Sequence, residues 1–243
     1  MFVNMNESTK KLNFDSDLFG YLVARIEKTS LNNKQLEHIL QNANKEKYKL
    51  LYWIVSPKDS IANKAASDNN GFLADKKVTY VRQLSDSAFT ERSKNIVSYM
   101  EKPLIEALRS LALQAVEYSR FSVDPNFKND ECKKLYVRWM ENSLSGDIAK
   151  EVFVYCEAGY ELGLITLGEK DKRCDISILA VDEQFRGKGI GGKLIESAFS
   201  YAKEKSYDTI QVVTQKENKR ACGFYEKCGF IEESCFNVYH FWL

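Results

Sequence analysis

The stretch ISILAVDEQFRGKGIGGKL, residues 176–194, decides the fold of this protein. Its first six residues are typical of a buried strand, a glycine-rich turn follows at residues 186–192, and the residues from Ile190 onward have the spacing of an amphipathic helix. A helix that begins in such a turn offers unpaired backbone N–H groups and the positive end of its dipole, and glycines let an anion approach the backbone closely. The stretch therefore predicts an anion-binding loop between a strand and a helix.

Two well-known phosphate loops fit this stretch poorly. The P-loop requires Ser or Thr after its Gly-Lys pair, whereas Lys193 is followed by Leu194. The dinucleotide fingerprint spaces its glycines as G-x-G-x-x-G within a βαβ unit, and the glycines of residues 187–192 are packed more closely than that. Arg186 and Lys188 add positive charge, so an anion remains the expected ligand.

A second pattern lies downstream, where Asn218 is followed by Tyr225 and then by the pair Gly229 and Phe230. The loop at residues 186–191 has the form Arg-x-x-Gly-x-Gly, and it resembles the coenzyme A signature of the GNAT superfamily of N-acetyltransferases. In that superfamily the next strand and helix supply an Asn and a Tyr, as they do here. The two ordered signatures extend the resemblance over roughly residues 151–243.

The resemblance implies an α/β (α+β) fold of the GNAT type, with a central mixed, mostly antiparallel sheet flanked by helices. It implies an acyl-CoA-dependent N-acyltransferase that takes acetyl-CoA or another short acyl-CoA as co-substrate and holds no metal. Tyr225 is then the general acid that protonates the departing thiolate. The residues that the resemblance assigns to acyl-CoA binding are Leu179, Ala180, Val181, Arg186, Gly187, Lys188, Gly189, Ile190, Gly191, Gly192, Asn218 and Phe224.

Upstream segments carry a narrower resemblance. Residues 18–20, 119–121, 136–142 and 213–215 look like the corresponding segments of bacterial TDP-4-amino-4,6-dideoxygalactose (TDP-fucosamine) N-acetyltransferases. These two-domain enzymes act in surface polysaccharide biosynthesis, such as that of lipopolysaccharide O-antigen, so the similarity implies a TDP-linked amino sugar as acceptor. It assigns acceptor binding to Arg120, Phe121, Tyr136 and Trp139.

Each assigned residue also has a purely structural interpretation. Tyr225 is one of 13 tyrosines, and most tyrosines of amphipathic helices pack in a core. Asn218 at a helix start is by default an N-cap, a role compatible with coenzyme binding. Tyr136 and Trp139 have the spacing of core residues on one helix face. Arg120 either pairs with an acidic neighbour or binds a diphosphate.

Other functions of the same sequence stay open at this point. An acetyltransferase that acts on a protein N-terminus, a lysine or a small amine would share the loop and Tyr225. A non-catalytic module that only binds acyl-CoA would share the loop alone. The sequence fixes neither the acyl chain, the amino sugar, the base for the amine nor the oligomeric state, and a homodimer is one possibility.

Composition narrows the class of protein further. A net charge of +1 provides no clustered basic surface, so nucleic acid is not an expected partner. The six cysteines form no C-x-x-C pair, which argues against a metal site. We find neither a signal peptide nor an apolar run long enough for a membrane span, and we therefore expect a cytoplasmic protein with reduced thiols.

The chain divides into two predicted domains, a smaller N-terminal α/β domain at 1–102 that shapes the acceptor site and a catalytic GNAT domain at 103–243. The first has the pattern β-α-β-α-β, and its polar end, residues 85–102, is the expected linker. Residues 63–72 echo residues 218–230, although the first copy is three residues shorter and lacks the tyrosine. We therefore expect the N-terminal domain to be a degenerate GNAT half that binds no coenzyme.

Overall fold

A computed structural model describes residues 8–84 and 93–243. Ten strands form a single open sheet in the order β1-β2-β3-β10-β4-β9-β8-β7-β6-β5. The strands are β1 (Thr9–Lys11), β2 (Leu22–Ile26), β3 (Tyr48–Val55), β4 (Phe72–Gln83), β5 (Ile96–Ser98), β6 (Glu151–Glu157), β7 (Tyr160–Lys170), β8 (Arg173–Val181), β9 (Thr209–Gln215) and β10 (Ile231–Trp242). The helices are α2 (Asn13–Phe19), α3 (Asn33–Lys45), α4 (Ser60–Asp68), α5 (Glu106–Gln114), α6 (Arg120–Val123), α7 (Glu131–Leu144), α8 (Ile190–Glu204) and α9 (Lys219–Lys227), with a 3₁₀ turn η1 (Glu183–Phe185).

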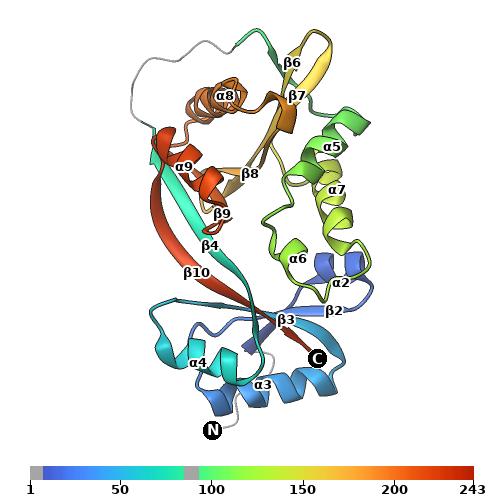
Figure 1. The fold of residues 1–243 in the computed structure, drawn as a ribbon, viewed down its shortest axis with the longest axis vertical. Coiled ribbons are helices and arrows are strands. Elements are labelled where there is room, and N and C mark those ends of the chain that lie inside the picture. The colour runs from blue at the N-terminus through green and yellow to red at the C-terminus, as the bar shows by residue number, and fades with distance from the viewer. Residues whose placement is uncertain (1–7, 85–92) are drawn as a thin grey trace.

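Helices cover both faces of this sheet, and the long central strands β4 and β10 run through both halves of the molecule (Figure 1). Helices α8 and α9 pack on the C-terminal half of one face, and α3 and α4 pack on its N-terminal half. Helices α5 and α7 cover the other face over β6, β7 and β8. Residues of α2, α6 and α7 cover that same face over β2 and β3.

The two halves are related by a local two-fold axis that the strand register reveals. In the antiparallel pair β4–β10, Lys77 lies opposite Phe236, and these positions differ by 159. Adding 159 to β4, Phe72–Gln83, gives the bounds of β10, Ile231–Trp242. The same shift converts each β4–β10 pair into another observed pair, and it converts the β3–β10 register into the β4–β9 register. The last strand of each half, β4 or β10, therefore pairs with strands of the other half, and this exchange makes the sheet continuous.

This register supports an internal copy but corrects the sequence alignment proposed for it. Asp59 caps α4 through the Ala62 amide, and Asn218 caps α9 through the Ala221 amide, so Asp59 rather than Asn63 is the counterpart of Asn218. After the helices, Asn70 and Gly229 both take a positive φ. The copies of this segment therefore have equal length, and the apparent three-residue deletion is wrong. Asn replaces Gly because both tolerate this left-handed turn.

The N-terminal copy lacks the features that would admit a coenzyme. Parallel pairing ends at equivalent positions, Ile26 with Trp53 in one half and Ile176 with Val212 in the other. Trp53 is fully buried, and its indole nitrogen donates to the Lys28 carbonyl at 2.6 Å, just past the end of β2. At the start of α3 a capping box of Asn32 and Gln35 already occupies backbone donors.

The predicted α/β class, with a mixed and mostly antiparallel sheet between helices, is confirmed. Two elements are additional to the predicted pattern. The helix α2 (Asn13–Phe19) precedes β2, and within the expected linker 85–102 residues Ile96–Ser98 form β5, which pairs with β6. Residues 85–92 of that segment lie outside the described residues. The division into domains at residue 102 stays a prediction.

Candidate functional site

The site lies where β8 and β9 separate. These strands pair in parallel only through Cys174–Ile176 and Ile210–Val212, and beyond this short ladder they diverge. A cavity of about 570 Å³ lies beside this divergence, with Ser177–Val181 of β8 on one side and residues 213–215 on the other. Because β9 has moved away, backbone groups on this side of β8 are free to bind an extended amide chain.

The glycine loop closes one end of the cavity, where Gly189, Gly191 and Gly192 lie on its wall. Gly189 takes a φ of +81° as the N-cap of α8, and none of the described side chains caps this helix. The unpaired N–H groups of the first turn of α8 therefore remain available for an anion. Arg186 anchors the loop, because its Nε donates to the Val181 carbonyl at 2.9 Å.

Eleven of the twelve residues predicted to bind acyl-CoA line the cavity. Besides Asn218 they are Leu179, Ala180, Val181, Arg186, Gly187, Gly189, Ile190, Gly191, Gly192 and Phe224. Asn218 also lines it, and its side chain caps α9, so both interpretations of this residue are compatible with the geometry. Lys188 is not among the lining residues, and its ammonium lies 4.3 Å from the centre of the Phe185 ring.

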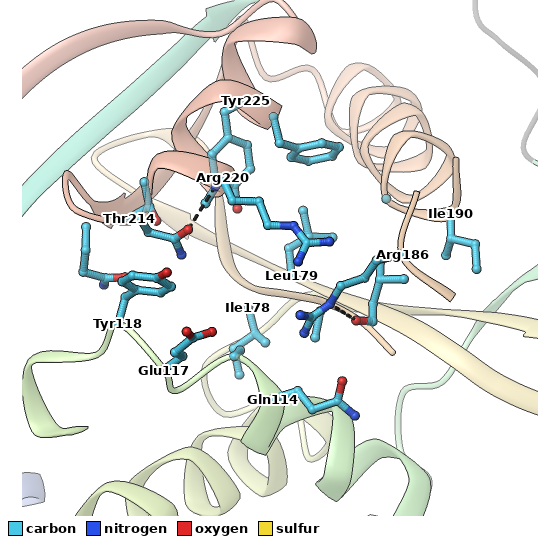
Figure 2. A pocket seen from close by; sticks show the side chains of 18 of the residues that line it. Gln114, Glu117, Tyr118, Ile178, Leu179, Arg186, Ile190, Thr214, Arg220 and Tyr225 are labelled. Atoms are coloured by element: carbon cyan, nitrogen blue, oxygen red, sulfur yellow. Dashed lines mark hydrogen bonds between the residues drawn. The ribbon is translucent and has the colours of Figure 1, made fainter. Parts of the chain in front are cut away.

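Tyr225 reaches the cavity from α9 (Figure 2). It is only 6% exposed, and its ring packs against Phe224 and Phe230 with centroids 5.5 and 5.8 Å away. Burial raises the pKa of its hydroxyl above the ordinary value. The side chain therefore combines core packing with a protonated hydroxyl at the cavity wall.

Several lining residues escaped the sequence analysis because they belong to no motif. Gln114, Glu117 and Tyr118 enter from the end of α5, and Arg220 enters from α9 (Figure 2). Gln114 fixes the spacing of this wall, since its Oε1 accepts from the Glu183 amide at 2.9 Å. In the sequence these four residues could be recognised only by their closeness to segments already predicted, and closeness in sequence does not by itself indicate a binding role.

The four predicted acceptor residues do not share one environment. Tyr136 lies on the cavity wall, whereas Arg120, Phe121 and Trp139 are not among its lining residues. Phe121 is 4% exposed in an aromatic core with Tyr52, and the Trp139 ring packs at a tilt against Tyr136 with ring centroids 5.1 Å apart. The core interpretation therefore describes Phe121 and Trp139 better.

Arg120 lies over the ring of Tyr52, 4.1 Å from its centre. The Tyr52 hydroxyl donates to Asp15 of α2 at 3.0 Å, so the N-terminal half positions this arginine. Among the described residues we find no ion pair or hydrogen bond to its guanidinium. Its donors remain available to an anion.

His240 and Asp124 form a buried pair close to Arg120. His240 Nδ1 lies 2.7 Å from Asp124 Oδ2, both side chains are fully buried, and the Trp242 indole donates to the same oxygen. Burial lowers the pKa of His240 to about 4 although Asp124 opposes this shift. Burial alone would raise the pKa of Asp124, but hydrogen bonds from His240, Trp242 and Asn126 lower it to about 2. His240 is thus a neutral core residue at pH 7.

This pair predicts an acid-sensitive fold. Because the folded-state pKa of His240 is depressed below the ordinary 6.5, its contribution is complete above pH 6.5 and is lost as the pH falls towards 4. We expect the free energy of unfolding to drop by roughly 2–3 kcal/mol over that range. In His240→Gln, which retains a nitrogen donor for Asp124 without titrating, this drop should shrink. Equal pH slopes of the two melting temperatures would contradict the assignment.

Within residues 8–84 and 93–243, no group of three or more His, Cys, Asp or Glu side chains is arranged to hold a metal ion. The same described ranges contain no helix with the length and hydropathy to cross a membrane.

A splayed parallel strand pair that ends in a glycine loop at a helix N-terminus defines a domain of the acyl-CoA-dependent transferases. The sequence agrees, since the profile of the acetyltransferase (GNAT) family matches residues 115–230. Residues 115–230 therefore form an acetyltransferase domain of the GNAT family, as predicted.

Two curated relatives are similar over about half of the chain. The spore coat polysaccharide biosynthesis protein SpsD of Bacillus subtilis (strain 168) is 29% identical over 137 residues, which cover 56% of this chain and 47% of SpsD. The dTDP-fucosamine acetyltransferase of Escherichia coli O6:H1 is 30% identical over 132 residues, covering 54% of this chain and 56% of the relative. The chain thus spans about half the length of these relatives.

The fold extends beyond the matched segment. A GCN5-related N-acetyltransferase from Sphaerobacter thermophilus superposes with a TM-score of 0.61 at 12% identity, covering 96% of this chain and 76% of that one. At this identity the similarity concerns the fold alone, and it confirms the predicted GNAT fold.

Proposed function

We propose that this protein transfers an acetyl or other short acyl group from acyl-CoA to the amine of a TDP-linked amino-deoxy sugar. The observation that carries the proposal is the cavity between β8 and β9, with the uncapped α8 N-terminus at one end and Tyr225 on its wall. Pantetheine would extend along Leu179–Val181, and the pyrophosphate would meet the glycine loop. Acceptance of a TDP-sugar is supported by the name of the E. coli relative, and a role in surface polysaccharides also by that of SpsD.

The reaction would be a direct transfer. The neutral amine attacks the thioester carbonyl, backbone N–H groups of the splayed strand stabilise the oxyanion, and the carbon–sulfur bond breaks. Tyr225 gives its proton to the departing thiolate. The amine loses its proton to a base that the geometry does not single out, and the products are an amide and coenzyme A. A cytoplasmic location belongs to the same proposal.

A thiol-release assay tests this function. Purified protein with acetyl-CoA should release coenzyme A with TDP-4-amino-4,6-dideoxygalactose, and mass spectrometry should find one added acetyl group on the sugar. A lysine peptide and a polyamine serve as competing acceptors. Preferential turnover of either competitor would replace the acceptor in the proposal, and absence of release with every amine would contradict an enzymatic role.

Arg120 is the predicted diphosphate ligand. We expect Arg120→Ala to raise the KM for the TDP-amino sugar by roughly 10- to 100-fold, because a charged hydrogen bond contributes about 1.5–3 kcal/mol. The KM for acetyl-CoA should change little, since Arg120 does not line the acyl-CoA cavity. Arg120→Lys keeps the charge but loses the planar stack on Tyr52, so its effect should be intermediate. Equal increases in both KM values would show that Arg120 is structural.

A further inference from the structure

Asp75 of β4 is a partly buried acidic residue, and one oxygen of its carboxylate has no hydrogen-bond partner among the described residues. Its Oδ1 is shielded from solvent and accepts no hydrogen bond from any described residue. A buried acceptor without a donor reduces stability, and a charged one reduces it more. Such an atom in a native fold requires an explanation, and a ligand that supplies the missing donor is one.

Asp75 is not among the residues that line the cavity, but the strand register places it close to the cavity on the side of the N-terminal half. Two residues further along the same face of β4, Lys77 lies opposite Gln215, and Gln215 lines the cavity. From α7, Tyr136 lines the cavity too; burial raises the pKa of that tyrosine, and the charge of Asp75 adds a smaller increase. An acceptor that extends from the reaction centre past Gln215 therefore approaches Asp75.

The titratable groups that interact with Asp75 come from four elements. Lys77 lies on its own strand, Arg120 on α6, Tyr136 on α7 and Cys235 on β10. Burial raises the pKa of Asp75 to about 7, although Arg120 and Lys77 act in the opposite direction. Burial also lowers the pKa of Lys77. In the described part of the chain neither Lys77 nor Arg120 forms an ion pair with Asp75. The carboxylate and the two cationic side chains are therefore each available to bind a ligand.

We propose that Asp75 binds the acyl acceptor, taking a hydrogen bond from its amino or hydroxyl groups while Arg120 binds its phosphates. This inference rests on the function proposed above and adds an acceptor-binding residue from the N-terminal half. It defines the acceptor class as a phosphorylated molecule that also carries hydrogen-bond donors. It also gives that half, which lacks a coenzyme site, a part in substrate selection.

Asp75→Asn is the decisive variant because the amide has nearly the same shape but no charge. We expect the KM for TDP-4-amino-4,6-dideoxygalactose to rise about ten-fold or more while the KM for acetyl-CoA stays the same. Wild-type kcat/KM for the acceptor should fall as the pH drops below about 7, since protonation removes the carboxylate charge. That acid limb should be absent from Asp75→Asn. The melting temperature at pH 8 should not fall, because the variant removes an unpaired buried charge.

Asp175→Asn is the matched control. Asp175 lies on the other strand beside β9, but the Gln211 side chain donates to its Oδ1 at 2.8 Å, so we expect an unchanged acceptor KM. Asp75→Glu keeps the charge and should retain the acid limb. An unchanged acceptor KM in Asp75→Asn would overturn the inference, as would a lower melting temperature with equal losses for both substrates.

Failure of the proposed function is distinguishable from failure of this inference. If wild-type protein acetylates no TDP-amino sugar, the acceptor named above is wrong, and the same variants are compared with the amine that gives the fastest thiol release. An Asp75-dependent KM and acid limb with that amine support acceptor binding by Asp75, and their absence overturns it.

Discussion

Tyr225→Phe should lower kcat by about 10²-fold or more while both KM values change little, because general acid catalysis typically contributes about 10²–10⁴. The substitution preserves the ring packing against Phe224 and Phe230 and removes only the hydroxyl at the cavity wall. Negative charge on the departing sulfur then lacks its proton donor. The loss should be partial, since a thiol with a pKa of roughly 8.5 is a tolerable leaving group.

The pH dependence of this effect follows from burial. Because the pKa of Tyr225 lies above its ordinary value of about 10, the hydroxyl stays protonated across the working range. The ratio of wild-type to Tyr225→Phe kcat should therefore be constant between about pH 6 and 9. Steady-state kinetics at both limits, with circular dichroism to verify folding, provide the measurement. A wild-type kcat in Tyr225→Phe would show that Tyr225 serves in core packing and not as the general acid.

Gly192→Asp should weaken acyl-CoA binding by roughly 10²-fold. A carboxylate about 5–6 Å from a phosphate costs on the order of 3 kcal/mol at the effective dielectric of a protein surface. Gly192 is the suitable position in the loop because an added Cβ meets nothing within 4 Å. At Gly189 the φ of +81° would strain any side chain, and at Gly191 the Cβ would lie 3.2 Å from the Phe224 ring.

Gly192→Asn is the control for Gly192→Asp, with equal size and no charge. Calorimetry with coenzyme A should show one site per wild-type chain, a small change for Asn and a large loss for Asp. Stability should not decrease in the Asp variant, since an acidic residue in the first turn of α8 interacts favourably with the helix dipole. Equal affinities of the Asp and Asn variants would show that no phosphate binds at this end of α8.

Local sequence chemistry was sufficient for the catalytic half. The strand, turn and helix of residues 176–204 follow from a short apolar run, glycines that permit a positive φ, and helical spacing, all of which act within a few residues. The same holds for Asn218, whose cap and cavity positions both follow from its place at the start of α9. Eleven of the twelve predicted coenzyme residues, Asn218 among them, therefore line one cavity. Lys188 does not line it, and its ammonium lies over the ring of its neighbour Phe185.

The acceptor side depends on contacts between residues distant in sequence. Arg120 is held by Tyr52 and thus by Asp15, and no local pattern connects these positions. The resemblance assigned Phe121 to acceptor binding, but the short helix α6 buries it in an aromatic core. Glu117, Tyr118 and Arg220 carry no motif, and only packing of α5 and α9 around the divergence of β8 and β9 brings them to the cavity.

By itself, the sequence determined the glycine loop between a strand and a helix and the GNAT domain, because these depend on propensities and spacings within single segments. Only the tertiary structure decided that β10 crosses into the N-terminal half and β4 into the C-terminal half, since strand exchange is set by pairing between segments about 159 residues apart. It also decided that one carboxylate oxygen of Asp75 is buried without a partner among the described residues, close to the cavity. Burial and charge proximity are properties of the assembled sheet, and no stretch of chain encodes them alone.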